Sequence, residues 1–393
     1  MAAPINPHVI DMLQYETPSL PRFARCVLLT ALMALASCAS TPNPEPASAE
    51  PADQLVQLVE RHNICAAAVA VIRQRTLHQV MTASGCDPAL DVRADSVFQA
   101  ASLSKPVFAY AVLKLVEQGR LALDAPVLRY LPHGYRHAFD PLQEGASASA
   151  DEVTDPRLQA VTVRMLLQHT AGLPNWASGP LHFKSTPGTR WTYSGEGYVL
   201  LQRAVEAVVG QPLDEVMQEQ VFAPLGMAHS SYRLTPEIAE RLLSGTKANG
   251  APRKVIELRR PVAAFSLYTT AEDYGRFLAA LLRDEALLAR ISDSPVDVDT
   301  GLNLRWGLGW GIEHTGDDVH LWQWGNNPGY RAFAIAFPRS GDGLVMLTNS
   351  DGGLKLAEPL VRAALPAQHE VFRSSFVTSG VMDVLCEVLR VCL

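Results

Sequence analysis

Residues that favour β-strands occur near both ends of this 393-residue chain, and the stretch between them favours helices. Residues 64–73 and 76–84 are β-rich runs separated by a short polar turn, as in an antiparallel hairpin. Strand patterns return beyond Trp306. The sequence therefore predicts an α+β fold in which N- and C-terminal strands share one antiparallel sheet, flanked by helices, with a mainly helical middle region. The C-terminal strands are expected at residues 309–313, 320–324, 331–337 and 343–349.

One predicted helix must begin close to Ser102, because Pro106 is tolerated only in a first helical turn. Between Pro106 and Val116 the only charged residue is Lys114, so this helix is expected to be buried in the middle of the protein. The other predicted helices cover residues 163–172, 197–209, 213–222 and 271–282.

Ser102 and Lys105 place a nucleophile beside a base at the start of the buried helix. Residues three apart share a helix face, so the hydroxyl and the amine are expected to lie together. A partly desolvated lysine near the positive end of a helix loses its proton more easily than one in water. Ser104 projects about 100° away from Lys105 and is a poor nucleophile candidate. The alternative is that Ser102 only caps the helix and Lys105 is solvated.

The first 37 residues are predicted to be a signal peptide. Arg22 and Arg25 precede the apolar residues 26–36, a run too short to span a bilayer. The run ends in Leu35-Ala36-Ser37-Cys38, which resembles the lipobox of bacterial lipoproteins. We therefore expect an exported protein, anchored by lipid on Cys38 in the cell envelope and most simply in the outer membrane facing the periplasm. The alternative is an ordinary cleaved signal in which Cys38 has no role.

Three further regions follow the signal. Residues 38–52 are rich in Pro, Ala and Ser and are predicted to be a tether. Residues 53–368 are expected to form the folded domain. Residues 369–393 are a tail in which residues 381–391 have helical spacing, and this tail either packs on the domain or stays apart from it.

Charge and cysteine content exclude some functions. The formal net charge is −7, and removing residues 1–37 takes away two acidic and two basic side chains, so no basic stripe for nucleic acid is expected. Cys65 and Cys86 are either a disulfide across the hairpin or two buried thiols. No zinc spacing appears, and neither a metal nor a cofactor is predicted. His133 and His137 fall in the polar residues 133–156, a predicted surface insertion, where we expect solvated histidines without a chemical role.

Five motifs in order resemble the penicillin-recognising serine hydrolases, which include class C β-lactamases, D-alanyl-D-alanine carboxypeptidases and related esterases. The resemblance runs from about residue 53 to residue 365. The motifs are Phe98-x-x-Ala101-Ser102-x-Ser104-Lys105, Leu166-Leu167-Gln168-His169-Thr170-Ala171-Gly172-Leu173, Pro187-Gly188-Thr189-x-x-x-Tyr193-Ser194, Pro224-Leu225-Gly226-Met227 and Thr270-Ala271-Glu272-Asp273.

The resemblance implies that Ser102 is the acylated nucleophile and Lys105 its proton-relay partner. Tyr193 matches the tyrosine of the family's Tyr-x-Asn motif, which acts as general base and acid through its phenolate or its hydroxyl. The third position is Gly195, so the asparagine side chain that contacts an amide group of β-lactams is absent.

The family's third motif, Lys-Thr-Gly or His-x-Gly on an edge strand, aligns with Gln323-Trp324-Gly325. The resemblance makes these residues substrate-binding, with Gly325 allowing close approach of a ligand. The backbone N–H groups of Asn326 and Ser102 are the expected oxyanion hole. Gln323 is neutral, so the usual cation for a substrate carboxylate is missing, unless Arg305 or Arg331 supplies one.

These inferences predict an exported serine hydrolase that works through an acyl-enzyme on Ser102, needs no cofactor or metal and takes a small-molecule acyl substrate. An esterase is favoured, because esters need only nucleophile, proton relay and oxyanion donors. Two alternatives stand beside it. The first is a β-lactamase or D-alanyl-D-alanine carboxypeptidase of the same family, and the second is a non-catalytic protein that binds cell-wall fragments or β-lactams.

Overall fold

The computed structural model describes residues 51–86, 89–143 and 149–377. Contacts divide the chain into residues 1–47 and residues 48–393, and everything described below belongs to the second unit. The predicted signal peptide, the lipidation site Cys38 and the helix expected at residues 381–391 lie outside the described residues. Within those residues, no helix combines the length and the apolar character needed to cross a bilayer.

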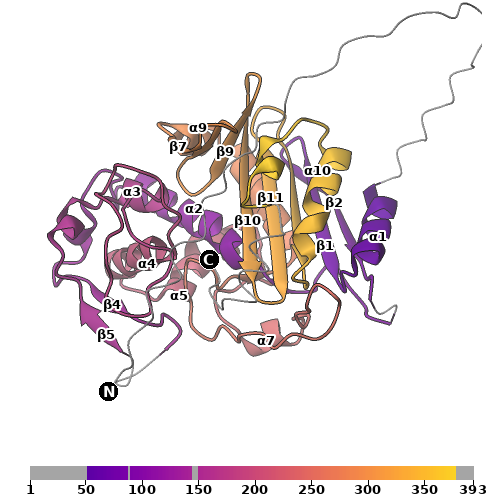
Figure 1. The fold of residues 1–393 in the computed structure, drawn as a ribbon, viewed down its shortest axis with the longest axis horizontal. Helices are drawn as coiled ribbons and strands as arrows, with labels where there is room; N and C mark the ends of the chain where they lie inside the picture. Colours follow the sequence, from indigo (N-terminus) through magenta and orange to yellow (C-terminus); the bar gives the residue numbers. More distant parts are fainter. Residues whose placement is uncertain (1–50, 87–88, 144–148, 378–393) are drawn as a thin grey trace, which may run out of the picture. The chain divides into compact units, whose positions relative to one another are not determined.

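An eight-stranded antiparallel sheet lies at the centre of the described chain (Figure 1). Its strand order is β2-β1-β12-β11-β10-β9-β8-β7, so the N-terminal hairpin pairs with the last strand. This topology confirms the predicted α+β fold. The strands are β1 (Ala67–Arg73), β2 (Thr76–Ala83), β7 (Val296–Asp299), β8 (Leu304–Trp306), β9 (Gly311–Thr315), β10 (Asp318–Asn327), β11 (Tyr330–Phe337) and β12 (Asp342–Thr348).

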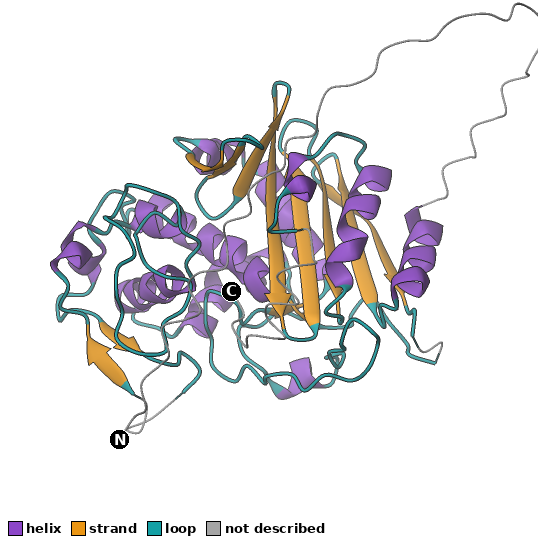
Figure 2. Cartoon of the chain, viewed as in Figure 1, coloured by secondary structure: helices purple, strands orange, loops and turns teal. Residues whose placement is uncertain are grey.

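Each face of the sheet buries its own apolar layer, because successive residues of a strand point to opposite faces. In β12, Val345 and Leu347 join the core that includes α8 (Ala271–Arg283). Leu344 and Met346 join the opposite core, which α1 (Pro51–His62) and α10 (Ala357–Ala364) cover side by side (Figure 2). Helices on both faces thus fix the strands that approach the site.

The helix that carries Lys105 is buried, as predicted. α2 (Ser104–Glu117) follows a single 3₁₀ turn over Ala101–Leu103, and its residues 104–113 are all buried. The hydroxyl of Tyr232 donates to the carbonyl of Ser104 (2.6 Å), and the hydroxyl of Tyr274 donates to the carbonyl of Leu103 (3.1 Å). These bonds hold the start of the helix from the core side.

The middle of the chain is mainly helical. In α4 (Gly195–Val209), the Ser194 hydroxyl accepts from the N–H of Gly197 at the start, and Gly210 ends the helix with a φ of +79°. The predicted helix over residues 213–222 is α5 (Leu213–Met217) followed by a π-helical turn over Gln218–Phe222. The other elements are α3 (Val163–Leu167), α6 (Ala223–Leu225), α7 (Pro236–Ala239), α9 (Glu285–Ser292), β3 (Phe98–Gln99) paired with β6 (Tyr268–Thr269), and β4 (Arg136–Ala138) paired with β5 (Ala150–Glu152).

The structure differs from the sequence prediction at several boundaries. The helix predicted over residues 163–172 ends at Leu167, and His169 has a φ of +57°. α1 begins at Pro51, two residues inside the predicted tether. Strands β7 and β8 extend the sheet beyond the predicted strands, and β7 escaped detection because its alternation of Val and Asp is short. The chain after residue 368 continues to pack on the domain, since Val371, Phe372 and Val377 are buried in the core that includes α1 and α10.

The expectation of a solvated His137 is wrong. Residues 136–138 pair with residues 150–152, and His137 is completely buried between the rings of Tyr135 and Phe139. Its Nε2 lies 3.1 Å from Oε2 of Glu196, which gives the buried ring a polar partner. His133 is exposed, as expected.

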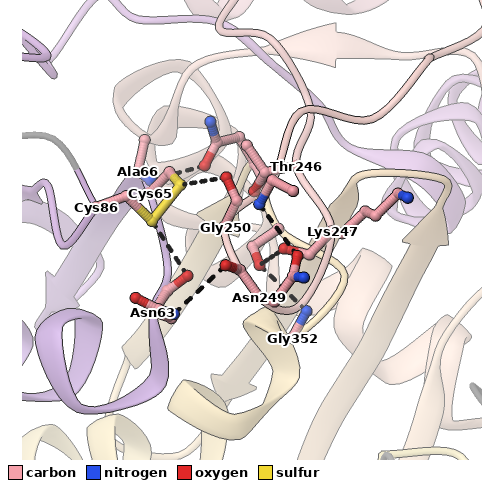
Figure 3. Close-up of a disulfide and its surroundings, with 12 residues drawn as sticks. Asn63, Cys65, Ala66, Cys86, Thr246, Lys247, Asn249, Gly250 and Gly352 are labelled. Atoms are coloured by element: carbon pink, nitrogen blue, oxygen red, sulfur yellow. Dashed lines mark hydrogen bonds between the residues drawn. A yellow bond between two sulfur atoms is a disulfide. The ribbon is translucent and has the colours of Figure 1, made fainter.

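Cys65 and Cys86 form a disulfide, which resolves the two possibilities left open by the sequence (Figure 3). The bond links the residues just before β1 and just after β2, so it closes the base of the hairpin. A third segment packs against it: a Cβ at Gly250, which has a φ of +80°, would lie 3.0 Å from Sγ of Cys86. The disulfide thus lies where the hairpin meets the loop at Gly250.

Candidate active site

Ser102 opens from the 3₁₀ turn into a cavity of about 750 Å³. Nζ of Lys105 lies 3.1 Å from Oγ of Ser102 and also donates to the carbonyl of Ala264 at 2.8 Å. Ala101, just before the serine, has a φ of +50°, a conformation that residues other than glycine seldom adopt. The structure therefore brings together the hydroxyl and the amine that the sequence pairs.

The chemical state of Lys105 follows from its burial. The side chain lies away from water, and this desolvation lowers the pKa of its ammonium to about 7. A large share of the lysine is therefore neutral near pH 7. A neutral amine 3.1 Å from a hydroxyl can accept its proton, which is the step that activates a serine nucleophile.

Tyr193 lies beside Ser102 and Lys105 and forms a three-residue cluster with them. Nε2 of Gln323 donates to the Tyr193 hydroxyl at 3.0 Å, and Nζ of Lys105 lies 4.7 Å from the centre of the Tyr193 ring. Burial raises the pKa of the Tyr193 phenol, although hydrogen bonds with Ser102 and Gln323 act in the opposite direction. The phenol therefore stays protonated in the neutral range. Of the two forms left open by the sequence, the hydroxyl fits this site.

Gln323 does not take the position expected of a substrate-binding residue. Its side chain is fully buried, and its Nε2 donates to the carbonyl of Ser102 (3.2 Å) as well as to Tyr193. Gln323 is also absent from the residues that line the cavity. Its place beneath the cavity lets it orient Tyr193, and we revise its expected role accordingly.

The two glycines of the predicted substrate-binding set are occupied by protein contacts. A Cβ at Gly325 would lie 2.5 Å from the carbonyl oxygen of Ala100, so this glycine lets β10 pack against the chain just before the nucleophile. A Cβ at Gly195 would lie 2.5 Å from ring carbons of Trp176. In both places a side chain would collide with the protein itself, so packing alone requires each glycine, and the ligand-approach role of Gly325 stays a prediction.

Trp324 and Asn326 line the cavity, and both lie on β10, which extends past the predicted strand end at residue 324 to Asn327. The two arginines considered as substitutes for the missing cation do not line it. Arg331 is buried with NH1 at 3.1 Å from Asp351, and Arg305 lies 3.2 Å from Asp297. Neither is among the described residues that line the cavity, so neither restores a cation there.

Ser104 is committed to the backbone. It is fully buried, its hydroxyl donates to the carbonyl of Ala101, and it accepts from the N–H of Leu267 at 2.9 Å. This geometry agrees with the prediction that Ser104 points away from Lys105.

His169 supports the cluster without lining the cavity. Its ring lies 4.4 Å from that of Tyr193, and its Nδ1 accepts from the N–H of Ser194 at 3.1 Å. Burial and the neighbouring Lys105 lower the pKa of His169 well below its ordinary value. The ring is therefore neutral, and it serves to position Tyr193 and the start of α4.

The cavity wall is largely apolar, and most of its aromatic residues were not identified from the sequence. Besides Lys105 and Tyr193, the described lining residues that can ionise are Asp140 and Glu196. Apart from Trp324 on β10, these aromatic residues lie in segments far apart in the sequence, and no spacing pattern marks them. The aromatic lining residues besides Tyr193 are Phe139, Trp176, Trp191, Phe265, Trp324 and Phe376. Phe376 belongs to the predicted tail, and its ring lies 5.1 Å from that of Trp324.

A separate polar cluster lies under the C-terminal segment. Among the described residues, Glu313, His320 and His369 place potential metal-ligand atoms within 4.8 Å of one another. No metal-ligand spacing marks this cluster in the sequence, because Glu313 and His320 are cross-strand partners and His369 lies far along the chain. Oε1 of Glu313 lies 2.5 Å from His369, and its Oε2 accepts from the N–H of Val371 at 3.0 Å. These bonds fasten the segment that carries Phe376 to the sheet.

An α+β fold with a serine, a lysine and a tyrosine clustered at one end of a buried helix defines a class of serine acyl-transfer sites. A family model described as Beta-lactamase matches residues 52–368. The chain therefore belongs to the Beta-lactamase family.

Named relatives have different activities. The chain is 25% identical over 315 residues to penicillin-binding protein 4* of Bacillus subtilis, covering 70% of this chain and 65% of that protein. It is 29% identical over 278 residues to esterase EstB of Burkholderia gladioli, covering 56% of this chain and 66% of that protein. The chain thus spans slightly less than two thirds of each. A beta-lactamase/D-alanine carboxypeptidase from Pseudomonas syringae has the same fold, with a TM-score of 0.66 and 18% identity. The match covers 81% of this chain and 98% of that one.

Proposed function

We propose that this chain is an exported serine hydrolase that cleaves small uncharged carboxylic esters through an acyl-enzyme on Ser102. The observation that carries the proposal is the contact between Ser102 and a buried Lys105 whose pKa is about 7, in the wall of a largely apolar cavity. The presence of an esterase among the named relatives agrees with it.

The proposed reaction uses the chain's own groups at each step. Oγ of Ser102 bonds to the ester carbon while its proton passes to neutral Lys105. The backbone N–H groups of Ser102 and Asn326 stabilise the negative oxygen that forms. The carbon–oxygen bond to the alcohol then breaks, and the leaving oxygen receives a proton through the Tyr193 hydroxyl, which Gln323 holds in place. Water attacks the acyl carbon next and gives up a proton to the same groups. The bond between the acyl carbon and Oγ of Ser102 then breaks, Ser102 regains a proton, and the carboxylic acid leaves.

The cavity favours esters over β-lactams and carboxylate-bearing peptides. Such substrates carry a carboxylate, yet the described wall has no arginine and includes the acidic residues Asp140 and Glu196. A charge-assisted contact is lost where Gln323 replaces the family's cation, and a side-chain hydrogen bond is lost at Gly195. Together these losses remove roughly 2 to 4 kcal/mol of recognition. At about 1.4 kcal/mol per factor of ten, this is on the order of a 30- to 700-fold handicap.

The test compares kcat/KM for p-nitrophenyl butyrate and nitrocefin on the same purified protein. We expect a clear preference for the ester, no turnover by Ser102→Ala, and a fluorophosphonate adduct mapped by mass spectrometry to Ser102. A clear preference for nitrocefin would favour the β-lactamase alternative. Absence of both turnover and adduct would favour the non-catalytic binding protein.

Export is supported by the disulfide between Cys65 and Cys86, because such bonds persist in oxidising compartments. We further propose that Cys38 is lipidated and anchors the mature protein to the cell envelope. The lipobox-like sequence that ends at Cys38 carries this part of the proposal.

A further inference from the structure

The loop that contains Trp176 is fastened to the start of α4, immediately after Tyr193. Side chains and backbone contribute bonds in both directions, so the loop is held beside the candidate catalytic tyrosine. The bonds run from Ser194 Oγ to the Pro174 carbonyl (2.7 Å), from Gly195 N–H to Asn175 Oδ1 (2.9 Å), from Glu196 N–H to the Asn175 carbonyl (3.0 Å) and from Ala177 N–H to Glu196 Oε1 (2.9 Å).

The Trp176 ring fills the space beside position 195. Two of its ring carbons lie 2.5 Å from the place where a Cβ on Gly195 would be, a distance that no side chain there could accept. The glycine and the tryptophan are therefore a matched pair. Phe265 packs edge-on against the ring, with centres 5.3 Å apart and planes at 89°. Both aromatic side chains line the cavity.

This fastened ring remains accessible to solvent. Trp176 is 38% exposed, and it is one of three large apolar side chains that are exposed among the described residues. A second, Ile256, is 53% exposed and lines the same cavity. An exposed apolar patch gathered in one concave site marks a surface on which a ligand binds.

We propose that Trp176 and Phe265 form an aryl subsite, and that the substrate carries a flat aromatic group close to its ester bond. This inference rests on the proposed function, because it names the substrate class of the same site. An aromatic ring gains about 0.5 to 1.5 kcal/mol from offset or edge-on contact beyond its burial of apolar area. At 1.36 kcal/mol per factor of ten, an aryl ester is preferred about 2- to 12-fold over its cyclohexyl counterpart.

Isomeric esters test the proposal and locate the ring. Methyl phenylacetate carries the ring in its acyl part and benzyl acetate carries it in its alcohol part. Methyl cyclohexylacetate and cyclohexylmethyl acetate are the saturated controls. We expect kcat/KM, measured by pH-stat titration, to favour the aryl member of at least one pair about 2- to 12-fold more than hydroxide-catalysed hydrolysis does. The pair that shows the preference identifies the part of the ester that occupies the subsite.

Variants separate aromatic contact from general apolar binding. Trp176→Leu should bring the aryl-to-cyclohexyl ratio close to that of the same pair in hydroxide-catalysed hydrolysis, and Trp176→Phe should retain part of the preference. Gly195→Ala should also lower the ratio, because the added methyl group displaces the ring. The matched control is Ile256→Ala, which removes apolar wall without an aromatic face and should lower both rates while keeping their ratio. Circular dichroism checks that each variant is folded.

Two outcomes overturn the subsite: a ratio in the wild-type protein that is no higher for either pair than in hydroxide-catalysed hydrolysis, or a ratio that Trp176→Leu leaves unchanged. The failure of the proposed function is a different result, namely no hydrolysis of any of the four esters above the Ser102→Ala background. In that case, calorimetric titration of the wild-type protein with phenylacetamide and cyclohexylacetamide decides. Tighter binding of phenylacetamide that is lost in Trp176→Leu supports the subsite, and equal or undetectable binding of the two overturns it.

Discussion

At the residue scale, the chemistry depends on one buried amine. Desolvation lowers the pKa of Lys105 to about 7, and only the neutral form can take the Ser102 proton. We therefore expect kcat/KM for a neutral ester to rise with pH through about 7 and to fall about tenfold per pH unit below that value. Lys105→Ala should lower kcat/KM on the order of 10²- to 10⁴-fold and remove its rise with pH.

The measurement is a pH–rate profile from pH 5.5 to 9 with a short-chain ester that does not itself titrate. The matched control is Lys355→Ala, an exposed lysine that should leave the profile unchanged. A flat profile in the wild-type protein, or the same rising limb in Lys105→Ala, would show that another group is the base.

The pairing of Ser102 with Lys105 was predictable from the sequence, because residues three apart on a helix lie on the same face and have little geometric freedom. It could not show that Gln323 is buried beneath Tyr193, since the aligned motif identifies a strand position but not which face meets solvent. Trp176 and Phe265 were missed for a related reason. Their contact joins two loops distant in the sequence, and no periodicity records such a pair.

At the element scale, the disulfide holds the N-terminal hairpin. Cys65 and Cys86 are 21 residues apart, and closing a loop of this size stabilises the fold by about 3 kcal/mol through the entropy of the unfolded chain. We expect the double variant Cys65→Ala/Cys86→Ala to lose about this much free energy of unfolding in urea titrations. Wild-type protein treated with a reductant is the control and should behave alike. Equal stability of oxidised wild type and variant would contradict the prediction.

A second element-scale prediction concerns the segment fastened by Glu313. Burial alone would raise the pKa of this carboxyl, but the contacts with His320 and His369 outweigh burial and lower it to about 2. The ordinary value is 4.5, so the folded state favours the carboxylate. The resulting stabilisation, on the order of 3 kcal/mol, is present above pH 4.5 and is lost as the pH falls toward 2.

Urea unfolding between pH 3 and pH 6 measures this effect. The stability difference between wild type and Glu313→Gln should shrink as the pH falls through this range, whereas the difference for Glu60→Gln, an exposed glutamate on α1, should stay near zero. A difference for Glu313→Gln that does not change with pH would assign its role to packing instead.

At the scale of the whole molecule, the strands at both ends of the chain were predictable because their β-rich runs are long and stand apart from the helical middle. The edge strand β7, its neighbour β8 and the β4–β5 pair were not, since each is only three or four residues long and gains its order from neighbours already in place.

The proposed lipid anchor is also a property of the whole chain. Two or more acyl chains attach a protein stably to a membrane, whereas an ordinary cleaved signal releases a free domain. We expect the wild-type protein, expressed in a Gram-negative host, to sediment with membranes and Cys38→Ala to move to the soluble fraction. Unchanged partitioning would remove the anchor and leave the hydrolase proposal intact.

The position of Phe376 has a practical consequence. The family match ends at residue 368, yet this phenylalanine forms part of the cavity wall through its contacts with Trp324 and Trp191. A gene truncated at the family boundary would encode the nucleophile, the lysine and the tyrosine but not that wall. An assay on such a shortened enzyme would report the selectivity of a wider, wetter cleft rather than that of the natural one, so libraries and crystals are best made with the chain extended to Val377 or beyond.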